Sequence, residues 1–185
     1  MGNIFFDLDQ LGYLGQNVII GKTVRIRYPH LVNIGDNCII DDFTYISTSL
    51  HLEANVHISA SCSIIGGAAS YVNIGEFSTF APNVTVAAGS DDYKSGIATP
   101  LVPKQFKADL EIGIINIGKH CILGSGSVVL PNVTFGNFSA LGALSLAKEN
   151  LDEGGLYAGI PAKRIGDRNM DEIQRLENEW KNKSG

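Results

Sequence analysis

The chain has 185 residues and a formal net charge of −5 at pH 7, and only 18% of its residues are charged. This balance argues against a broad nucleic-acid or membrane-binding face, and no apolar run approaches the roughly 20 residues of a membrane span. The length suits one domain with a short appendage, and residues 1–12 carry Asp7 and Asp9 instead of the basic start of a signal peptide.

A six-residue repeat dominates the chain after an N-terminal extension that we expect over residues 1–19, part of it helical. Ile20–Gly21 and Ile26 indicate a first partial coil. An apolar residue then leads each of six units, three more after a short break, and five more after a longer one: Ile34, Ile40, Ile46, Leu52, Ile58 and Ile64; Ile74, Phe80 and Val86; Ile117, Leu123, Val129, Phe135 and Leu141. A period of six is neither helical nor that of a simple strand. It predicts a solenoid in which each unit buries its leading residue against the next coil.

Glycine and cysteine hold fixed places in the repeat. Glycine often follows the leading residue, as at Gly35 and Gly75, where we expect it to provide positive φ at a tight corner. Cys38, Cys62 and Cys121 each take the fifth place of a unit, which predicts small buried side chains. Three thiols without metal spacing favour a reducing cytoplasm.

The longest break in the repeat covers residues 88–113, and the coils resume after it. A long irregular excursion from a rigid solenoid is a typical place for function. We therefore expect one solenoid domain over 20–166 that carries this excursion.

The end of the chain, residues 167–185, is more highly charged. Apolar residues recur there at helical spacing: Met170, Ile173, Leu176 and Trp180. This spacing predicts a C-terminal helix whose apolar stripe packs against or caps the solenoid.

Three features together carry a family resemblance. They are the repeat, the segment Gly124-Ser-Gly-Ser-Val-Val-Leu-Pro-Asn-Val-Thr and the segment Tyr157-Ala-Gly-Ile-Pro-Ala-Lys-Arg-Ile. Over roughly residues 18–166 the chain resembles the hexapeptide-repeat acyltransferases, in particular sugar acetyltransferases of the galactoside and surface-polysaccharide branch. The resemblance implies an all-β fold, a left-handed parallel β-helix with a short C-terminal helix. It also implies acetyl-CoA as donor, no metal, and a homotrimer with active sites between neighbouring chains.

The resemblance also implies a donor site in the C-terminal coils. The pantetheine amides would bond to backbone groups at the corners Gly124–Ser125 and Gly142–Ala143. Lys163 and Arg164 would meet the CoA phosphates. Lys148 is a weaker carry-over, because relatives have Thr-Lys where this chain reads Lys-Glu.

The acceptor site requires a nucleophile, a proton acceptor and donors for the oxyanion. His57 precedes Ile-Ile-Gly-Gly as in relatives with a similar stretch, so the resemblance makes it the candidate base. The usual catalytic histidine of galactoside-type members falls on Asp91, in the segment Gly-Ser-Asp-Asp-Tyr. Asp91 and Asp92 are suited to hold an ammonium or sugar hydroxyls, or to orient His57 of a neighbouring chain. The loss of the usual histidine favours an amino sugar over a hydroxyl acceptor, with a nucleotide-linked sugar among the candidates.

Other interpretations stay open at this point. The chain could be a galactoside-type O-acetyltransferase, could take its acyl group from an acyl-carrier protein, or could be a non-catalytic β-helix trimer. A metalloenzyme of the γ-carbonic anhydrase type needs three converging histidines, whereas His51 and His57 fall on successive, diverging corners. His30 and His120 are interpreted as surface residues.

Overall fold

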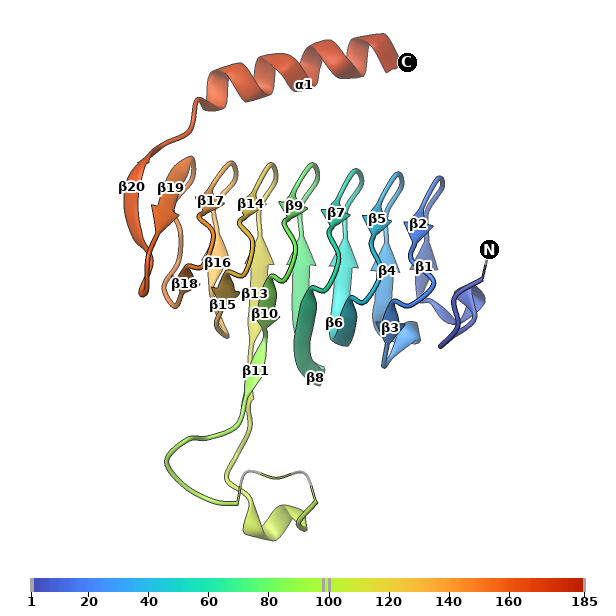
Figure 1. Cartoon of the computed structure of the whole chain (residues 1–185), viewed down its shortest axis with the longest axis vertical. Helices are drawn as coiled ribbons and strands as arrows, with labels where there is room; N and C mark the ends of the chain where they lie inside the picture. The colour runs from blue at the N-terminus through green and yellow to red at the C-terminus, as the bar shows by residue number, and fades with distance from the viewer. Residues whose placement is uncertain (1, 98, 100, 185) are drawn as a thin grey trace.

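The computed structural model describes residues 2–97, 99 and 101–184. It confirms a parallel β solenoid of about seven turns with one C-terminal helix (Figure 1). The strands form three parallel ladders around one core, and β6 and β8 continue through a corner and so belong to two ladders.

The ladders contain strands that recur once per turn. The first comprises β1 (Tyr13–Leu14), β4 (Val32–Ile34), β6 (Tyr45–Leu52), β8 (Ser63–Ile74), β13 (Ile114–Ile117) and β16 (Thr134–Phe135). The second comprises β2 (Ile19–Ile20), β5 (Ile39–Ile40), β7 (His57–Ile58), β9 (Thr79–Phe80), β14 (Ile122–Leu123), β17 (Ala140–Leu141) and β19 (Gly155–Ala158). The third comprises β3 (Arg25–Ile26), the early parts of β6 and β8, β10 (Thr85–Ala87), β15 (Val128–Val129) and β18 (Leu146–Ala147). Three 3₁₀ turns lie outside the ladders: η1 (Leu8–Gln10), η2 (Pro29–Leu31) and η3 (Lys104–Phe106).

The leading residues of the repeat form the core. Each one named above from Ile34 to Leu141 is at most 1% exposed. In the second ladder Ile40 pairs with Ile58, and Ile58 with Phe80, so each leading residue lies on its counterpart in the next turn. Period, register and burial therefore agree.

The three cysteines are buried and unpaired, as their places in the repeat predicted. Burial raises the pKa of the Cys62 thiol to about 11 and also raises the pKa values of Cys38 and Cys121. A thiol in such surroundings stays protonated and inert. These residues pack the core.

The glycines that follow leading residues have a different reason from the one expected. Positive φ falls two positions later, for example on Phe77 and not on Gly75. A Cβ at Gly124 would lie 2.4 Å from the backbone nitrogen of Ala143 in the next turn, and one at Gly75 would lie 2.7 Å from the carbonyl carbon of Gly118. Glycine is required because stacked turns approach closely at this place.

The N-terminal segment joins the solenoid earlier than the expected boundary at residue 20. Strand β1 already pairs with β4, and Tyr13 lies opposite Asn33. Before it, Phe6 and Leu11 are buried in the core cluster and close the first turn. The segment thus caps one end of the apolar core.

The excursion leaves the solenoid as a two-stranded ribbon. Strand β11 (Gly89–Ser90) pairs antiparallel with β12 (Glu111–Ile112), and the loop between them projects well away from the turns (Figure 1). Two residues near the ends of this ribbon, Ala88 and Ile115, are fully buried in the core of the solenoid.

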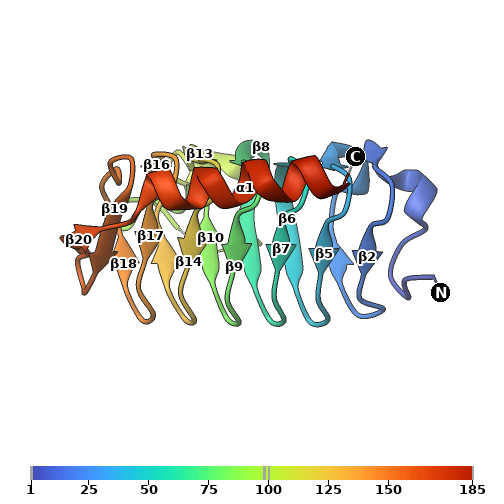
Figure 2. The same ribbon diagram turned by 90° about the horizontal axis from the view of Figure 1, so that it is seen from above.

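The C-terminal helix α1 (Met170–Ser184) does not cap the solenoid end, which corrects one of the two expected roles. Strand β20 (Lys163–Asp167) runs antiparallel to β19 at that end, and α1 turns back along the length of the solenoid (Figure 2). No helix in the described part of the chain is long and apolar enough to cross a membrane.

The C-terminal helix α1 packs against a stack of three rings on the solenoid. Phe77, His120 and Phe138 occupy the same corner position in successive turns, each with φ near 60°, and adjacent ring centroids lie 5.0 Å apart. Trp180 of α1 meets the Phe77 ring edge-on at 5.5 Å. Positive φ is unfavourable for bulky residues, so the stacking offsets a backbone cost.

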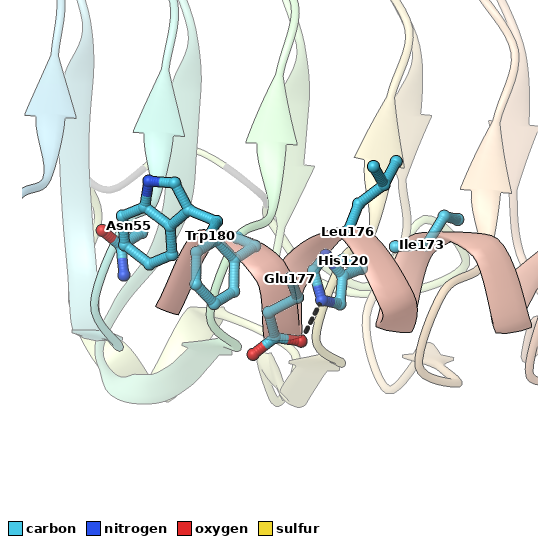
Figure 3. Close-up of a pocket in the computed structure, with 7 residues that line it drawn as sticks. Asn55, His120, Ile173, Leu176, Glu177 and Trp180 are labelled. Atoms are coloured by element: carbon cyan, nitrogen blue, oxygen red, sulfur yellow. Dashed lines mark hydrogen bonds and ion pairs between the residues drawn. The ribbon is translucent and has the colours of Figure 1, made fainter. Parts of the chain in front are cut away.

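A buried carboxylate fixes the helix on this stack. The Glu177 side chain is 2% exposed and accepts hydrogen bonds from Lys119 Nζ at 2.6 Å, Lys181 Nζ at 2.7 Å and His120 Nε2 at 2.8 Å. Figure 3 shows the contact between Glu177 and His120. His120, whose side chain is 10% exposed, therefore contacts the helix and is not the surface residue expected. An apolar cavity of about 430 Å³ beside it is lined by residues of this same junction, such as Ile173 and Leu176.

Candidate active site

A cavity of about 520 Å³ opens at the root of the excursion. Its walls come from four places: the residue after β3, the corner in β8, the ribbon β11–β12 with its loop, and the corner after β15. Its polar lining residues are Arg27, Ser90, Asp91, Tyr93, Lys107 and Glu111. It thus brings together residues far apart in the sequence around the predicted acceptor loop.

Close backbone packing shapes the floor of this cavity. A Cβ on Gly89 would lie 2.6 Å from the Gly66 carbonyl oxygen, and a Cβ on Gly66 would lie 2.9 Å from the Gly89 nitrogen. Both positions therefore require glycine, which lets the ribbon start directly on the β8 corner. This contact places Ser90 and Asp91 at the cavity wall.

The two adjacent aspartates have different surroundings. The Asp92 carboxylate accepts hydrogen bonds from Ser95 Oγ at 2.5 Å and the Lys94 backbone N–H at 2.8 Å, and these bonds lower its pKa. Asp92 thus stabilises the turn of the loop and does not line the 520 Å³ cavity. The Asp91 carboxylate lines that cavity and has no hydrogen-bond or ion-pair partner among the described residues. Asp91 is the aspartate that is free to bind a ligand.

His57 lies on the second ladder, away from this cavity within one chain. Its Nε2 is 2.9 Å from Asp41 Oδ2, and the two side chains are 42% and 44% exposed. Its carboxylate partner is therefore Asp41 of the same chain. Such a carboxylate fixes the imidazole ring and leaves Nδ1 for another partner.

The predicted donor corners lie on neighbouring turns. The Gly124 N–H donates to the Leu141 carbonyl at 2.7 Å, and the Leu144 N–H donates to the Ser125 carbonyl at 2.9 Å. Ser125 and Ala143 are the second residues of their corners, and their own amide groups donate to no other backbone group in the described chain. Small residues and free amides suit the close approach of a pantetheine chain.

The predicted phosphate-binding cations lie beyond these corners on exposed surface. Arg164 forms ion pairs with Asp167 at 2.5 Å and Asp152 at 3.3 Å, and the hydrogen bond that it donates to the Asp167 carboxylate raises the pKa of Arg164. Lys163 is exposed and forms no ion pair within the described part of the chain, whereas Lys148 lies 3.6 Å from the Glu149 carboxylate. A phosphate at Arg164 would have to share the guanidinium with two carboxylates.

Comparison with known proteins decides the family. No protein-family model matches the sequence. The chain is 33% identical to dTDP-4-amino-4,6-dideoxy-D-glucose acyltransferase from Escherichia coli, across 94% of this chain and 92% of that protein. The chain belongs to the hexapeptide-repeat acyltransferases.

Two further relatives agree with this assignment. The crystal structure of a single-site mutant of AntD, an N-acyltransferase from Bacillus cereus, in complex with dTDP-4-amino-4,6-dideoxyglucose and coenzyme A superposes with a TM-score of 0.89. The two chains are 32% identical, and 98% of each is covered. Galactoside O-acetyltransferase of Escherichia coli K12 is 25% identical over 91% of this chain and 86% of its own length. The chain is an enzyme, an acyltransferase.

Sequence reasoning overlooked three charged residues of this acyltransferase's cavity. Arg27, Lys107 and Glu111 all line it, although they lie outside the motifs that carry the resemblance. The available signal was Arg25 and Arg27 on either side of the inward-facing Ile26, because alternate residues of a strand share a face. Nothing local to Lys107 or Glu111 indicated a site.

The histidines do not converge in the acyltransferase chain. His51 lies on the first ladder and His57 on the second. Among residues 2–97, 99 and 101–184, no three His, Cys, Asp or Glu side chains are grouped so that they could hold a metal ion.

Proposed function

We propose that this acyltransferase transfers the acetyl group of acetyl-CoA to the amine of a nucleotide-linked amino sugar, in the cytoplasm, during surface-polysaccharide assembly. Similarity to an acyltransferase of dTDP-4-amino-4,6-dideoxy-D-glucose over nearly the whole chain supports the class of acceptor. The observation that carries the proposal is the Asp91 carboxylate, which lies in the wall of the 520 Å³ cavity and has no hydrogen-bond or ion-pair partner among the described residues. A carboxylate at this place suits an ammonium group better than a neutral hydroxyl.

The chemistry follows from what an amine requires. Asp91 binds the ammonium form, and loss of one proton exposes the nitrogen lone pair. The nitrogen attacks the thioester carbonyl carbon, the carbon–sulfur bond breaks, and a second proton passes from the nitrogen to the departing thiolate, so that the products are an amide and the CoA thiol. Backbone N–H groups at the turns are suited to stabilise the oxyanion during this attack.

We further propose that His57 accepts the proton, and that it does so from a neighbouring chain of a homotrimer. Its pairing with Asp41 supports this role, because a carboxylate orients the ring and stabilises the imidazolium that forms. Within one chain it lies on a different ladder from the Asp91 cavity, so a second chain is needed to complete the site.

The donor would lie along the corners Gly124–Ser125 and Gly142–Ala143. Two free amides on adjacent turns match the amide groups of pantetheine. The phosphates of CoA would then reach Lys163 and Arg164, with Lys148 at the edge of the same groove.

An acceptor panel tests the proposal. Thiol release from acetyl-CoA is measured with dTDP-4-amino-4,6-dideoxyglucose, the free amino sugar, dTDP-glucose and a galactoside, and 3-hydroxybutyryl-CoA replaces acetyl-CoA in a parallel set. We expect turnover on the amino sugars alone. Turnover on dTDP-glucose or the galactoside, with none on the amines, would overturn the proposal.

One observation favours a second function, O-acetylation of a sugar. The Asp41–His57 pair is the kind of base that a hydroxyl nucleophile requires, whereas an amine needs less assistance. The dTDP-glucose and galactoside arms of the panel distinguish this alternative.

A further inference from the structure

Two arginines lie on the outer side of the third ladder, Arg25 in strand β3 and Arg27 directly after it. Arg25 and Arg27 flank Ile26, which is buried, and both arginine side chains are exposed. Their surroundings differ, because only Arg27 lines the cavity that contains Asp91. Arg27 is therefore the candidate ligand-binding residue, and Arg25, two positions earlier, is its matched control.

Aromatic rings lie beside both guanidinium groups. The Arg25 Cζ lies 5.9 Å from the Phe5 ring centroid and 5.9 Å from that of Tyr45. Arg27 lies 5.5 Å from the Tyr28 ring centroid and has no ion pair with any carboxylate among the described residues. Its hydrogen-bond donors are therefore available to a ligand in the cavity.

The charges that face Arg27 across the cavity are Asp91, Lys107 and Glu111. Glu111 accepts a hydrogen bond from Asn132 Nδ2 at 3.2 Å, whereas Lys107 has no ion pair in the described chain. The cavity thus contains one free carboxylate and two free cations. A ligand with one amine and a group of negative charge complements this arrangement.

We infer that Arg27 binds the diphosphate of the nucleotide-linked acceptor while Asp91 holds the sugar amine. The inference rests on the proposed function and adds the residue that selects the nucleotide-linked acceptor over the free sugar. A guanidinium suits this task, because its fork of N–H donors matches two phosphate oxygens. Lys107 would contribute a second positive charge.

The diphosphate of CoA is a second source of the same chemistry, and the fold argues against it. The predicted donor corners and Lys163 lie in the last turns of the solenoid, whereas β3 lies near its first turn (Figure 1). Arg27 is therefore at the opposite end of the solenoid from the phosphate-binding residues predicted for CoA.

Steady-state kinetics of Arg27→Ala, Arg27→Lys and Arg25→Ala test the inference. For each variant, kcat/KM is measured with dTDP-4-amino-4,6-dideoxyglucose and with the free amino sugar, and KM for acetyl-CoA is recorded. We expect Arg27→Ala to lower the preference for the nucleotide-linked sugar by roughly 10- to 100-fold, the loss of one or two charge-assisted hydrogen bonds. Arg27→Lys should recover part of that preference, and Arg25→Ala should change it by less than about twofold.

Binding of dTDP to the same variants gives a readout that does not depend on turnover. We expect Arg27→Ala to weaken dTDP binding by a similar factor and to leave CoA binding unchanged. An unchanged sugar preference with unchanged dTDP affinity would overturn the inference, as would a loss confined to CoA. A wild-type enzyme that turns over no amino sugar would instead refute the proposed function.

Discussion

Replacing Glu177 by Gln should release the C-terminal helix without melting the solenoid. Burial by itself raises the pKa of this carboxyl, but hydrogen bonds from Lys119, Lys181 and His120 outweigh burial and lower it to about 2. Relative to the usual value of 4.5, that shift corresponds to roughly 3 kcal/mol in favour of the ionised, docked form. Lys181 is 48% exposed, so solvent weakens its share, and we expect about 2 kcal/mol.

The single tryptophan of the chain reports docking directly, because Trp180 lies on α1 against the Phe77 ring. Glu177→Gln should shift its emission to the red and speed amide hydrogen exchange in α1 by roughly 30-fold, the equivalent of 2 kcal/mol. Exchange in strands such as β5 and β14 should not change.

The dependence on pH has a definite sign. The pKa of Glu177 is lower in the docked state than in the free helix, so its contribution is complete above about 4.5 and is lost as the pH falls towards about 2. The wild-type Trp180 signal should therefore move across this interval, and the Glu177→Gln variant should lack that component.

Glu179→Gln is the matched control, because Glu179 is on the same helix and, among the described residues, its ion-pair partner is the exposed Arg175. Its effect should stay below about 0.5 kcal/mol. If Glu177→Gln also changes exchange in α1 by less than twofold, or retains the acid transition of Trp180, the buried carboxylate does not dock the helix and the reasoning is refuted.

Three further predictions concern the site. His57→Ala and Asp91→Asn should each lower kcat/KM by roughly 10²-fold or more. When the two variants are refolded together, about a quarter of wild-type activity should return, because random assortment of chains reunites His57 and Asp91 in that share of sites. Mixtures no more active than either variant would contradict a site shared between two chains. In titration calorimetry, Arg164→Ala should weaken the binding of CoA by roughly 10-fold and that of dephospho-CoA much less. Arg175→Ala is the control. Equal losses of affinity for both ligands would mean that Arg164 acts structurally. Gly124→Ala should lower the free energy of unfolding by about 1–3 kcal/mol in urea denaturation, because the added Cβ would lie 2.4 Å from the Ala143 nitrogen. Gly166→Ala is the control, since a Cβ there meets nothing within 4 Å and should leave the stability unchanged. Equal stabilities of the two variants would exclude the close contact as the reason for glycine at position 124.

The aspartates show how far the sequence leads into the site. Their position after Ser90 marked the loop, but the sequence did not separate Asp91 from Asp92. The separation arises from Ser95 and Lys94, whose hydrogen bonds occupy Asp92. Likewise, the motif around His57 predicted it as the base, while its partner Asp41 depends on which corner the stacking of turns places beside it.

The sequence by itself determined the solenoid, its core residues, the excursion and the existence of the C-terminal helix. Each of these follows from a local period, and a strict period of six leaves few ways to bury the leading residues. Only the tertiary structure decided that α1 lies along the solenoid, that His120 contacts it and that Arg27 shares a cavity with Asp91. These contacts join residues tens of positions apart, and their partners are set by the stacking of turns and not by any signal within one turn.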